Sequence, residues 1–353
     1  MANFNLDTHK LKYHPIEIAK FYNDEEVKPI YVEISPVANC NHRCLFCHYN
    51  YLGHEGKFQK GRLLSLVEEV AKMGAKSLVF GGVGEPTINK ETILAIKKAK
   101  KLGLDVGLMT NGALLKESEL EDLIKNLTWI RFSFNAGTAE TYAIVHQTNE
   151  KDYAKVSQTI SHLVKLKKKF ESDITIGVQY ILLPENKDDV INQAKVFKNI
   201  GVDYFVVKHF YSHEKNIYNP DMSFLDKAFI ENLLKKQKDI QTEKFSFIVR
   251  STENLNQNRV YNKCYGLPFI LYIREDGEVY TCFSYQHESK TSLGNIYTSS
   301  LGDIWTSSQK KEAINFINEK IDKNRCQPNC RHHQINNYLW DLKHPSVEHI
   351  NFI

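Results

Sequence analysis

The sequence predicts an α/β protein, a partial (β/α)6 barrel followed by a smaller α+β domain. From Ile30 onward, short β-branched runs alternate with longer segments of helical periodicity, which is typical of strand–helix units around a parallel sheet. After about residue 245 the pattern changes to two strand-like runs around Asp276-Gly277, which indicate a hairpin. At 353 residues the chain is long enough for one large core with a smaller domain attached.

Six strand–helix units are too few for a closed eight-stranded barrel and enough for an open, curved one. The predicted strands lie at 30–35, 77–80, 105–110, 129–134, 174–182 and 203–209. The helical segments that follow them lie at about 62–74, 91–102, 116–126, 152–170, 186–200 and 223–239. We therefore expect an N-terminal extension over 1–29, the barrel over 30–245 and the smaller domain with a C-terminal helix over 246–353.

Unusual residues follow the predicted strands and do not precede them. A cysteine-rich stretch follows the first strand, "GGVGEP" (Gly81 to Pro86) the second and "TNG" (Thr110 to Gly112) the third, while "SFNAG" (Ser133 to Gly137) ends the fourth. In barrels of this kind the chemistry gathers at the C-terminal ends of the strands. The four loops are therefore expected to meet at one site.

Composition excludes several classes of protein. Hydrophobic residues make up 42% and charged residues 25% of the chain, as in ordinary globular proteins. A net charge of +4, from 46 basic and 42 acidic residues, is too small to indicate a nucleic-acid partner. The basic run "KLKKKF" (Lys165 to Phe170) falls late in a predicted helix, where cations suit the helix dipole. No signal peptide and no membrane span is predicted, so we expect a cytoplasmic location.

Three of the seven cysteines, Cys40, Cys44 and Cys47, lie together after the first strand. In a reducing compartment such thiols are more often metal ligands or catalytic groups than disulfides. Three thiolates on one loop suit a four-iron cluster with one open iron. A zinc site completed by His42 or His48 is the competing interpretation, and the spacing by itself does not separate the two.

The spacing CxxxCxxC, with Phe46 before the third cysteine, resembles the signature of the radical S-adenosylmethionine (radical SAM) superfamily. "GGVGEP" is similar to the family's Gly-Gly-Glu segment, although Val83 and Gly84 intervene before Glu85. The resemblance spans about residues 30 to 210 and implies a 4Fe-4S cluster and bound S-adenosyl-L-methionine. The implied cofactor-binding residues are Phe46, Gly82, Gly84, Glu85, Thr110, Asn111, Ser133, Asn135 and Gln179.

The other four cysteines form a second pattern. Cys264, Gly277 and Cys282 have a spacing that resembles SPASM and twitch domains, and Cys326 and Cys330 complete the set. In that family these domains hold auxiliary iron–sulfur clusters, and four cysteines are enough for one fully ligated cluster. Two 4Fe-4S clusters are therefore implied in total. A zinc ribbon with four cysteine ligands is the alternative.

The resemblance implies a hydrogen-abstracting enzyme. In the family the first cluster reduces S-adenosyl-L-methionine, and the resulting 5'-deoxyadenosyl radical takes a hydrogen atom from the substrate. With all seven cysteines assigned as ligands, none is left to return a hydrogen atom, which disfavours a radical epimerase of a sugar. We therefore predict a dehydrogenase-type oxidoreductase, with the auxiliary cluster accepting the second electron.

Substrate and partners are less well defined by the sequence. A sugar or aminocyclitol alcohol is the predicted substrate, and flavodoxin or ferredoxin is the implied electron donor. A peptide-modifying maturase and a zinc-stapled binding protein are the rival classes. The candidate polar groups at the site are Gln179, Lys208, His209, Arg250, Tyr285, Gln286 and His287, of which Lys208 and Arg250 are preferred for substrate binding. Ile335, Leu339 and Leu342 have the spacing of an amphipathic C-terminal helix.

Overall fold

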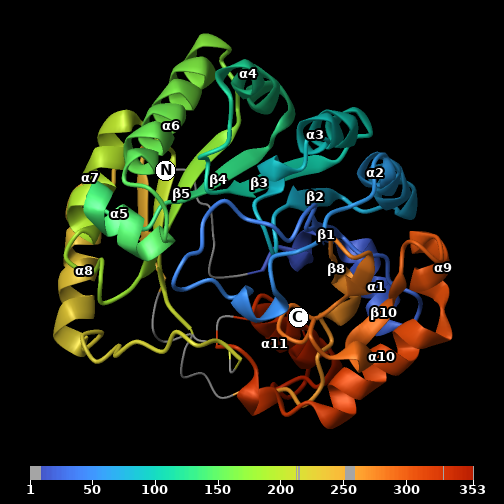
Figure 1. The fold of residues 1–353 in the computed structure, drawn as a ribbon. Helices are drawn as coiled ribbons and strands as arrows, with labels where there is room; N and C mark the ends of the chain where they lie inside the picture. The colour runs from blue at the N-terminus through green and yellow to red at the C-terminus, as the bar shows by residue number, and fades with distance from the viewer. Residues whose placement is uncertain (1–8, 212, 214, 251–258, 329, 353) are drawn as a thin grey trace.

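The computed structural model describes residues 9–211, 213, 215–250, 259–328 and 330–352. Its strands form a ten-stranded sheet in the order β10-β9-β8-β1-β2-β3-β4-β5-β6-β7. The sheet curves into an open barrel with helices along its outer side (Figure 1). The strands are β1 (Tyr31–Ile34), β2 (Ser77–Phe80), β3 (Asp105–Thr110), β4 (Trp129–Ser133), β5 (Thr175–Leu182), β6 (Tyr204–His209), β7 (Ser246–Val249), β8 (Ile270–Ile273), β9 (Glu278–Tyr280) and β10 (Ser292–Asn295).

The six predicted barrel strands are confirmed as β1 to β6, and all of them pair in parallel. Side chains alternate between the two faces of each strand. On β5, for example, Val178 and Tyr180 are buried in the main core against the helices, which leaves Gln179 on the inner face. The inner face of the barrel therefore carries the polar groups of the site.

The helices of the barrel follow its strands as predicted. Their bounds are α2 (Arg62–Met73), α3 (Thr92–Lys101), α4 (Glu117–Asn126), α5 (Ala139–His146), α6 (Lys151–Lys169), α7 (Val190–Ile200) and α8 (Lys227–Ile240). The basic run ends α6, with Lys167, Lys168 and Lys169 in its last turn. The short helix α5 was not predicted. It lies between β4 and α6 and becomes part of the site.

The barrel sheet is larger than the sequence indicates. β7 adds a seventh parallel strand beside β6, and β8 pairs in parallel with β1 at the opposite end. The predicted hairpin is confirmed, because β8 and β9 pair antiparallel and Gly277 takes a positive φ of 88° at the turn. The C-terminal segment is therefore built onto the same sheet as the barrel. The division at residues 245 and 246 stays a prediction.

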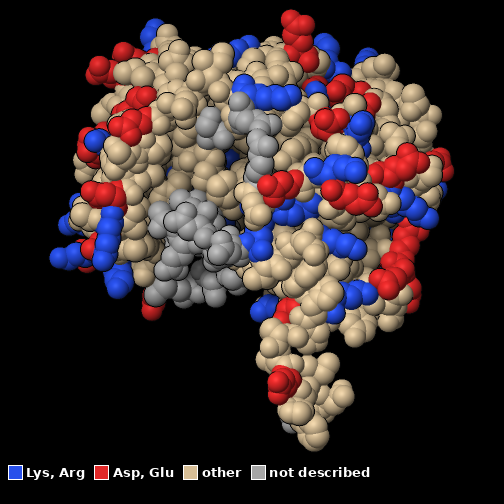
Figure 2. All heavy atoms as spheres, turned by 90° about the horizontal axis from the view of Figure 1, so that it is seen from below, with Lys and Arg blue, Asp and Glu red and all other residues tan. Residues whose placement is uncertain are grey.

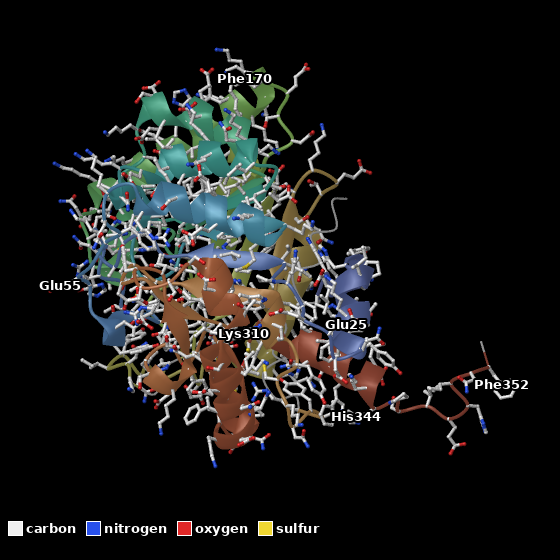
Figure 3. The ribbon with its side chains drawn as sticks, turned by 90° about the vertical axis from the view of Figure 1, so that its right-hand side faces the viewer. Glu25, Glu55, Phe170, Lys310, His344 and Phe352 are labelled. Atoms are coloured by element: carbon white, nitrogen blue, oxygen red, sulfur yellow. The ribbon has the colours of Figure 1, made fainter. Side chains whose placement is uncertain are left out.

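The two ends of the described chain pack together. The predicted C-terminal helix is confirmed as α11 (His332–Lys343), with Ile335 and Leu339 buried. These side chains share a core with Leu11, Val27 and strands β8 and β9, next to α1 (Pro15–Tyr22). Beyond His344 the chain leads away from the body of the molecule (Figure 3). The remaining helices are α9 (Leu301–Thr306) and α10 (Ser308–Lys320), with short 3-10 turns at 11–13, 50–52, 86–88, 267–269, 289–291 and 323–325.

The surface agrees with the weak net charge. Acidic and basic side chains are interspersed on the face that Figure 2 shows, without a large area of one sign. Among the described residues, no helix has the length and apolar character that crossing a membrane requires.

Candidate active site with two cysteine clusters

The cluster loop, residues 35–50 after β1, carries Cys40, Cys44 and Cys47. It is fastened to the end of α5 by two backbone hydrogen bonds, in which Arg43 N donates to His146 O and Leu45 N to Val145 O, each at 3.0 Å. Within the loop, Cys47 N donates to Cys44 O at 3.1 Å. The Arg43 guanidinium donates to Cys40 O and, at 2.9 Å, to His42 O. The loop is thus held in one conformation by protein groups.

The loop after β2 packs directly against the cluster loop. A Cβ atom on Gly84 would lie 2.3 Å from Asn39 O and 2.4 Å from Val37 O, so only glycine fits there. Glu85 N donates to Asn39 O at 3.0 Å. Gly82 has a φ of 96°, and the next amide, Val83 N, donates to Ser35 Oγ at 3.0 Å. These glycines let the two loops pack backbone against backbone.

Glu85 ties the ends of β2 and β3 together. Its side chain is 3% exposed. One carboxylate oxygen accepts from Thr110 Oγ1 at 2.6 Å and from the hydroxyl and amide of Thr87, and the other accepts from Asn111 N at 2.8 Å. Burial raises the pKa of Glu85, and these hydrogen bonds oppose the rise. The carboxylate therefore positions both loops, and its assignment as a cofactor-binding residue stays a prediction.

The predicted residues on β3 to β5 lie around the same loop. Asn111 Nδ2 donates to Asn41 Oδ1 at 2.8 Å and lies 3.8 Å from Cys40 Sγ. Ser133 ends β4 and pairs in register with Gln179 on β5. Gln179 Oε1 is buried and has no hydrogen-bond partner among the described groups. An orphaned acceptor inside the barrel suits a ligand that carries N–H or O–H donors.

Asn135 and Phe46 both meet His146 of α5. The Asn135 side chain is fully buried, and its backbone amide donates to His146 Nε2 at 3.1 Å. The Phe46 and His146 ring centroids lie 5.9 Å apart in an edge-on arrangement. His146 Nδ1 lies 3.2 Å from Cys44 Sγ. Burial holds the pKa of His146 well below its usual value, so the ring is neutral.

The zinc alternative for this loop, with its three cysteines and His42 or His48 as ligands, is not favoured by the grouping of the ligand atoms. His42 Nε2 pairs with Asp152 at 3.1 Å, and the His48 ring stacks on Phe283. Among the described residues, His42, Cys44 and His146 form the one group of three whose ligand atoms lie close enough for a metal ion. That group does not include Cys40 or Cys47, so it is not the set of three cysteines and one histidine that the zinc alternative requires.

The second cysteine set converges in the C-terminal segment. Cys264 precedes β8, Cys282 follows β9, and Cys326 and Cys330 lie between α10 and α11. Burial raises the pKa of the Cys282 thiol to about 12, and charge repulsion from Cys330 and Cys326 adds to the rise. Burial and charge repulsion from Cys330 likewise raise the pKa of Cys326 to about 11. Four half-buried thiols whose charges as thiolates repel one another suit a cation that offsets those charges.

Hydrogen bonds hold the residues of this second set in place. Asn336 Nδ2 donates to Cys264 Sγ at 3.1 Å, and Cys264 N donates to Asn318 Oδ1 at 2.7 Å. The Arg259 guanidinium donates to the carbonyls of Cys326 and Gln327. Arg331, directly after Cys330, pairs with the buried Glu33 of β1 at 3.1 Å. The set is thereby anchored to the first barrel strand.

Comparison with known proteins identifies both halves of this site. The radical SAM superfamily model matches residues 34–197, and the SPASM iron–sulfur cluster-binding domain matches residues 264–332. The chain therefore contains a radical SAM domain followed by a SPASM domain. Together the matches imply S-adenosyl-L-methionine and two 4Fe-4S clusters as the cofactors of this enzyme. The buried thiol sets and the orphaned Gln179 Oε1 fit these groups.

Two curated relatives show the range of proteins that the chain resembles. One is the tungsten-containing aldehyde ferredoxin oxidoreductase cofactor-modifying protein of Pyrococcus furiosus, 27% identical over 327 residues, which are 86% of each chain. Another is the S-adenosylmethionine-dependent nucleotide dehydratase of Flammeovirga pacifica, 28% identical over 165 residues. That match covers 44% of this chain and 56% of the dehydratase.

Solved structures share the fold. SuiB of Streptococcus suis bound to S-adenosylmethionine has a TM-score of 0.69 at 15% identity, covering 92% of this chain and 76% of SuiB. The enzyme anSMEcpe with bound AdoMet has a TM-score of 0.60 at 18% identity, covering 89% of this chain and 96% of that one. Identities this low establish the fold alone. They place the radical SAM barrel and the C-terminal cluster-binding segment in one architecture.

The remaining predicted polar groups lie in two places. Lys208 is on the inner face at the end of β6, and Arg250 directly follows β7, where Arg250 N donates to Val207 O at 3.1 Å. His209 is buried on the opposite face, with Nε2 3.0 Å from Arg250 O. Tyr285, Gln286 and His287 follow Cys282, and Gln286 is buried.

A cavity of about 850 Å³ opens beside the cluster loop. Arg43 and Tyr51 of the loop region line one side of it, and Lys187 and Tyr218, from the segments after β5 and β6, line another. The Tyr218 hydroxyl donates to Glu185 at 2.7 Å. Sequence reasoning missed this cavity and His146, because both depend on residues that only the fold brings together. The apolar run Tyr142 to Val145 before His146 was the available signal for α5.

Proposed function

We propose that this enzyme removes a hydrogen atom from the alcohol-bearing carbon of a sugar-like small molecule and oxidises that carbon by two electrons. The observation that carries the proposal is the distribution of the thiols. All seven cysteines of the chain are described, three of them on the cluster loop and four converging in the C-terminal segment. No thiol remains to return a hydrogen atom to the substrate.

In this proposal Cys40, Cys44 and Cys47 hold the first cluster, and Cys264, Cys282, Cys326 and Cys330 hold the second. When bound, the cofactors supply the acceptor for the hydrogen atom and the acceptor for the second electron, and the hydroxyl proton of the alcohol passes to water. The chain positions the reacting groups. Glu85 and Gly84 hold the loop that faces the cluster loop, and Gln179 offers an acceptor to the nucleoside cofactor.

The substrate is proposed to bind between the cluster loop and the inner ends of β6 and β7. The cavity beside the loop is lined by apolar side chains, such as Leu45 and Phe224, and by polar groups, which include Asn50, Gln147 and Asn216. The polar groups offer hydrogen-bond partners to hydroxyls, and the apolar ones can pack against the carbon skeleton of a sugar-like ring. Lys208 and Arg250 are the proposed substrate-binding cations. Free clustered thiols also fit a cytoplasmic location with flavodoxin or ferredoxin as the electron donor.

The ligand assignment is tested by iron and sulfide analysis after anaerobic reconstitution. We expect about eight irons per chain, falling to about four when Cys40, Cys44 and Cys47 are all replaced by alanine. A variant with the four C-terminal cysteines replaced is the matched control and is expected to retain the other four irons. If the native protein binds only four irons and these vanish in the triple variant, the auxiliary cluster and the oxidation both have to be abandoned.

The reaction is tested with a panel of sugars, sugar phosphates and aminocyclitols. We expect one member to accelerate 5'-deoxyadenosine formation and to lose two hydrogens, with deuterium from its carbinol carbon appearing in 5'-deoxyadenosine. The reaction is repeated in deuterated water. A product of unchanged composition that has gained solvent deuterium on carbon identifies an epimerase and contradicts the oxidation.

A second candidate function follows from the match to the Pyrococcus protein, which spans 86% of both chains. In that case the hydroxylated substrate would be the organic part of a metal cofactor. The test uses the cofactor released from a tungsten-containing aldehyde ferredoxin oxidoreductase in the same 5'-deoxyadenosine assay. Turnover of this cofactor without turnover of the panel would select the second candidate.

A further inference from the structure

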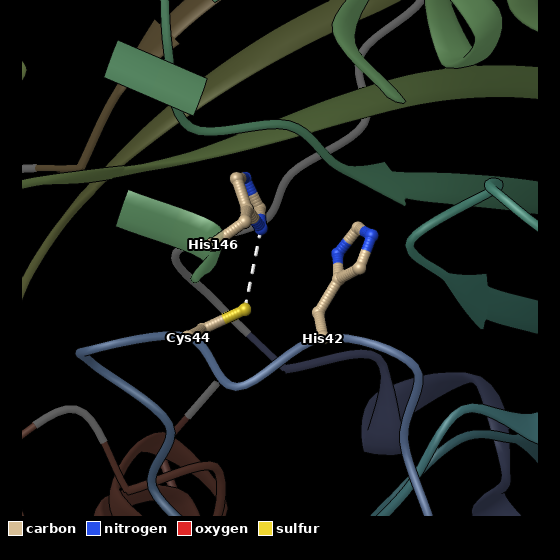
Figure 4. A group of neighbouring side chains, drawn as sticks. All are labelled: His42, Cys44 and His146. Atoms are coloured by element: carbon tan, nitrogen blue, oxygen red, sulfur yellow. Dashed lines mark hydrogen bonds between the residues drawn. The ribbon is translucent and has the colours of Figure 1, made fainter. Parts of the chain in front are cut away.

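His146 points at a thiol of the cluster loop from outside that loop. Its Nδ1 lies 3.2 Å from Cys44 Sγ, well within hydrogen-bonding distance for a sulfur acceptor. Figure 4 shows the imidazole reaching from the end of α5 toward the cysteine, with His42 beside it. The corresponding contact at Cys40, from Asn111 Nδ2, is longer at 3.8 Å. Cys44 therefore has the closest side-chain partner on the loop among the described residues.

The partners of the other ring nitrogen fix the tautomer. The backbone amide of Asn135 lies 3.1 Å from His146 Nε2, and an amide N–H can only donate, so Nε2 is the acceptor. The side chain of Asn135 supports the same assignment of Nε2 as the acceptor. Its Oδ1 accepts from Ile181 N at 2.5 Å, which turns Nδ2 toward Nε2 at 3.3 Å. The neutral ring then carries its proton on Nδ1 and donates it to Cys44 Sγ.

The ring is held rigidly in this position. His146 is fully buried, and its ring stacks on the ring of Tyr142, with centroids 4.2 Å apart and an angle of 25° between the planes. The carbonyl of His146 accepts from the amide of Arg43, which precedes Cys44, and that of Val145 accepts from the amide of Leu45, which follows it. Loop and ring therefore form one unit.

The same hydrogen bonds argue against a zinc site at His42, Cys44 and His146. A metal ion at Nδ1 would have to displace the proton that the two donors at Nε2 hold there. The geometry gives His146 the role of a hydrogen-bond donor to a thiolate and not that of a metal ligand.

We propose that His146 is a positioning residue that orients Cys44 and raises the reduction potential of the cluster held by the loop. The inference rests on the ligand assignment in the proposed function. Hydrogen bonds to the sulfurs are one of the factors that set such potentials. Reduction adds negative charge to the cluster and its thiolates, so an N–H donor stabilises the reduced state more than the oxidised one.

The test compares His146→Phe with His146→Gln in the reconstituted full-length protein. Phenylalanine keeps a ring and removes the donor, while the glutamine amide can donate to Cys44. The readout is an EPR-monitored redox titration, with the auxiliary cluster as an internal reference. In His146→Phe we expect about a tenfold lower ratio of reduced to oxidised cluster at a fixed potential, which for one electron equals about 59 mV. We expect His146→Gln to recover most of the native potential.

His42→Phe is the matched control, since His42 is equally buried and nearby but makes no hydrogen bond to Cys44 Sγ among the described contacts. It is expected to leave the potential unchanged. Equal potentials in the native and His146→Phe proteins, at equal iron content, would overturn the proposal.

A second measurement covers the case in which His146→Phe fails to take up its cluster. Long-range proton–nitrogen NMR of protein labelled with ¹⁵N-histidine reports the tautomer of His146 before reconstitution. An Nδ1–H tautomer supports the proposal, and an Nε2–H tautomer overturns it. The iron count of the triple cysteine variant tests the ligand assignment separately, and a failed alcohol oxidation leaves this result unaffected.

Discussion

The ring of His48 stacks on the ring of Phe283, with centroids 5.1 Å apart and planes 27° apart. His48 follows Cys47 of the cluster loop directly, and Phe283 follows Cys282 of the second set. The two cysteine sets are therefore joined through aromatic contacts of Phe283. Tyr49 and Tyr272 pack edge-on against the same phenylalanine. These contacts link the barrel to the C-terminal segment at the point where both proposed clusters lie.

We predict that His48 and Phe283 are energetically coupled. In a double-mutant cycle of His48→Leu and Phe283→Leu, the coupling free energy is expected to be about 0.5–1.5 kcal/mol, the usual value for an aromatic pair. Urea unfolding of the four proteins measures it. Phe283→Leu combined with Val347→Ala, an exposed site in the C-terminal tail, should be additive. Strict additivity in the His48 cycle would show that the stacking contributes nothing.

Gly84 is predicted to tolerate no side chain. A Cβ at this position would meet two backbone carbonyl oxygens, which cannot move without displacing the cluster loop. Gly84→Ala should lower the free energy of unfolding by about 1–3 kcal/mol and reduce iron uptake by the first cluster. Thermal unfolding and iron analysis measure the two effects.

Gly302→Ala provides the control for Gly84→Ala. Gly302 lies in α9, and the nearest atom to an added Cβ is Ser300 Oγ at 3.8 Å. The alanine should stabilise the helix by about 0.5–1 kcal/mol and leave the iron content unchanged. A Gly84→Ala protein that behaves like Gly302→Ala would contradict the backbone contact.

Glu85→Gln is predicted to destabilise the loops after β2 and β3. Each carboxylate oxygen accepts from a backbone amide, one from Thr87 and the other from Asn111, so either orientation of a glutamine brings its NH₂ group against an N–H donor. The expected loss is about 1–3 kcal/mol in the free energy of unfolding. Urea unfolding measures it.

Glu91→Gln is the matched substitution for Glu85→Gln. Glu91 accepts one backbone hydrogen bond, from Gly61 N at 2.8 Å, which a glutamine oxygen can replace. Its effect should stay within about 0.5 kcal/mol. Equal effects of the two substitutions would mean that the Glu85 network does not hold the loops.

The sequence predicts the barrel well because its signal is local. Each of β1 to β6 is a short run of apolar residues that packs against the helices, and polar residues mark where the strands end. β7 was not among the predicted strands, although its run "SFIV" is as long as the "SLVF" of β2, because no site motif directly follows it to mark a strand end. The pairing of β8 with β1 joins segments far apart in the chain, and no local pattern encodes such a contact.

The site divides in the same way. Cys40, Cys44 and Cys47 are recognised from their spacing alone. His146 is a single histidine in a helix, and only the packing of α5 against the cluster loop shows its importance. Glu85 was expected to face a ligand, and the fold surrounds it with four protein donors. Motifs predict which loops meet, while the hydrogen bonds within the fold decide what each side chain does there.

Gln179→Met is predicted to stabilise the cofactor-free protein and to weaken its binding of S-adenosyl-L-methionine. The orphaned Oε1 of Gln179 is a buried acceptor, and such a group costs about 1–3 kcal/mol when it is left without a donor. Methionine has a similar shape and removes that cost. In the reconstituted protein the same change removes an acceptor for the cofactor, so about tenfold weaker binding is expected, equal to about 1.4 kcal/mol. Urea unfolding and equilibrium dialysis measure the two effects.

Tyr142→Phe separates these two effects. The hydroxyl of Tyr142 is also buried without a partner among the described groups, and it lies on α5, where a phenylalanine ring keeps the stacking on His146. Its removal should stabilise the protein in the same way and leave cofactor binding unchanged. If Gln179→Met also stabilises the protein but binds the cofactor with native affinity, then Gln179 Oε1 is a buried acceptor without a donor that has no role in cofactor binding. Selective loss of affinity in Gln179→Met places its acceptor in the cofactor site, because the two variants then differ only in what the removed oxygen faced.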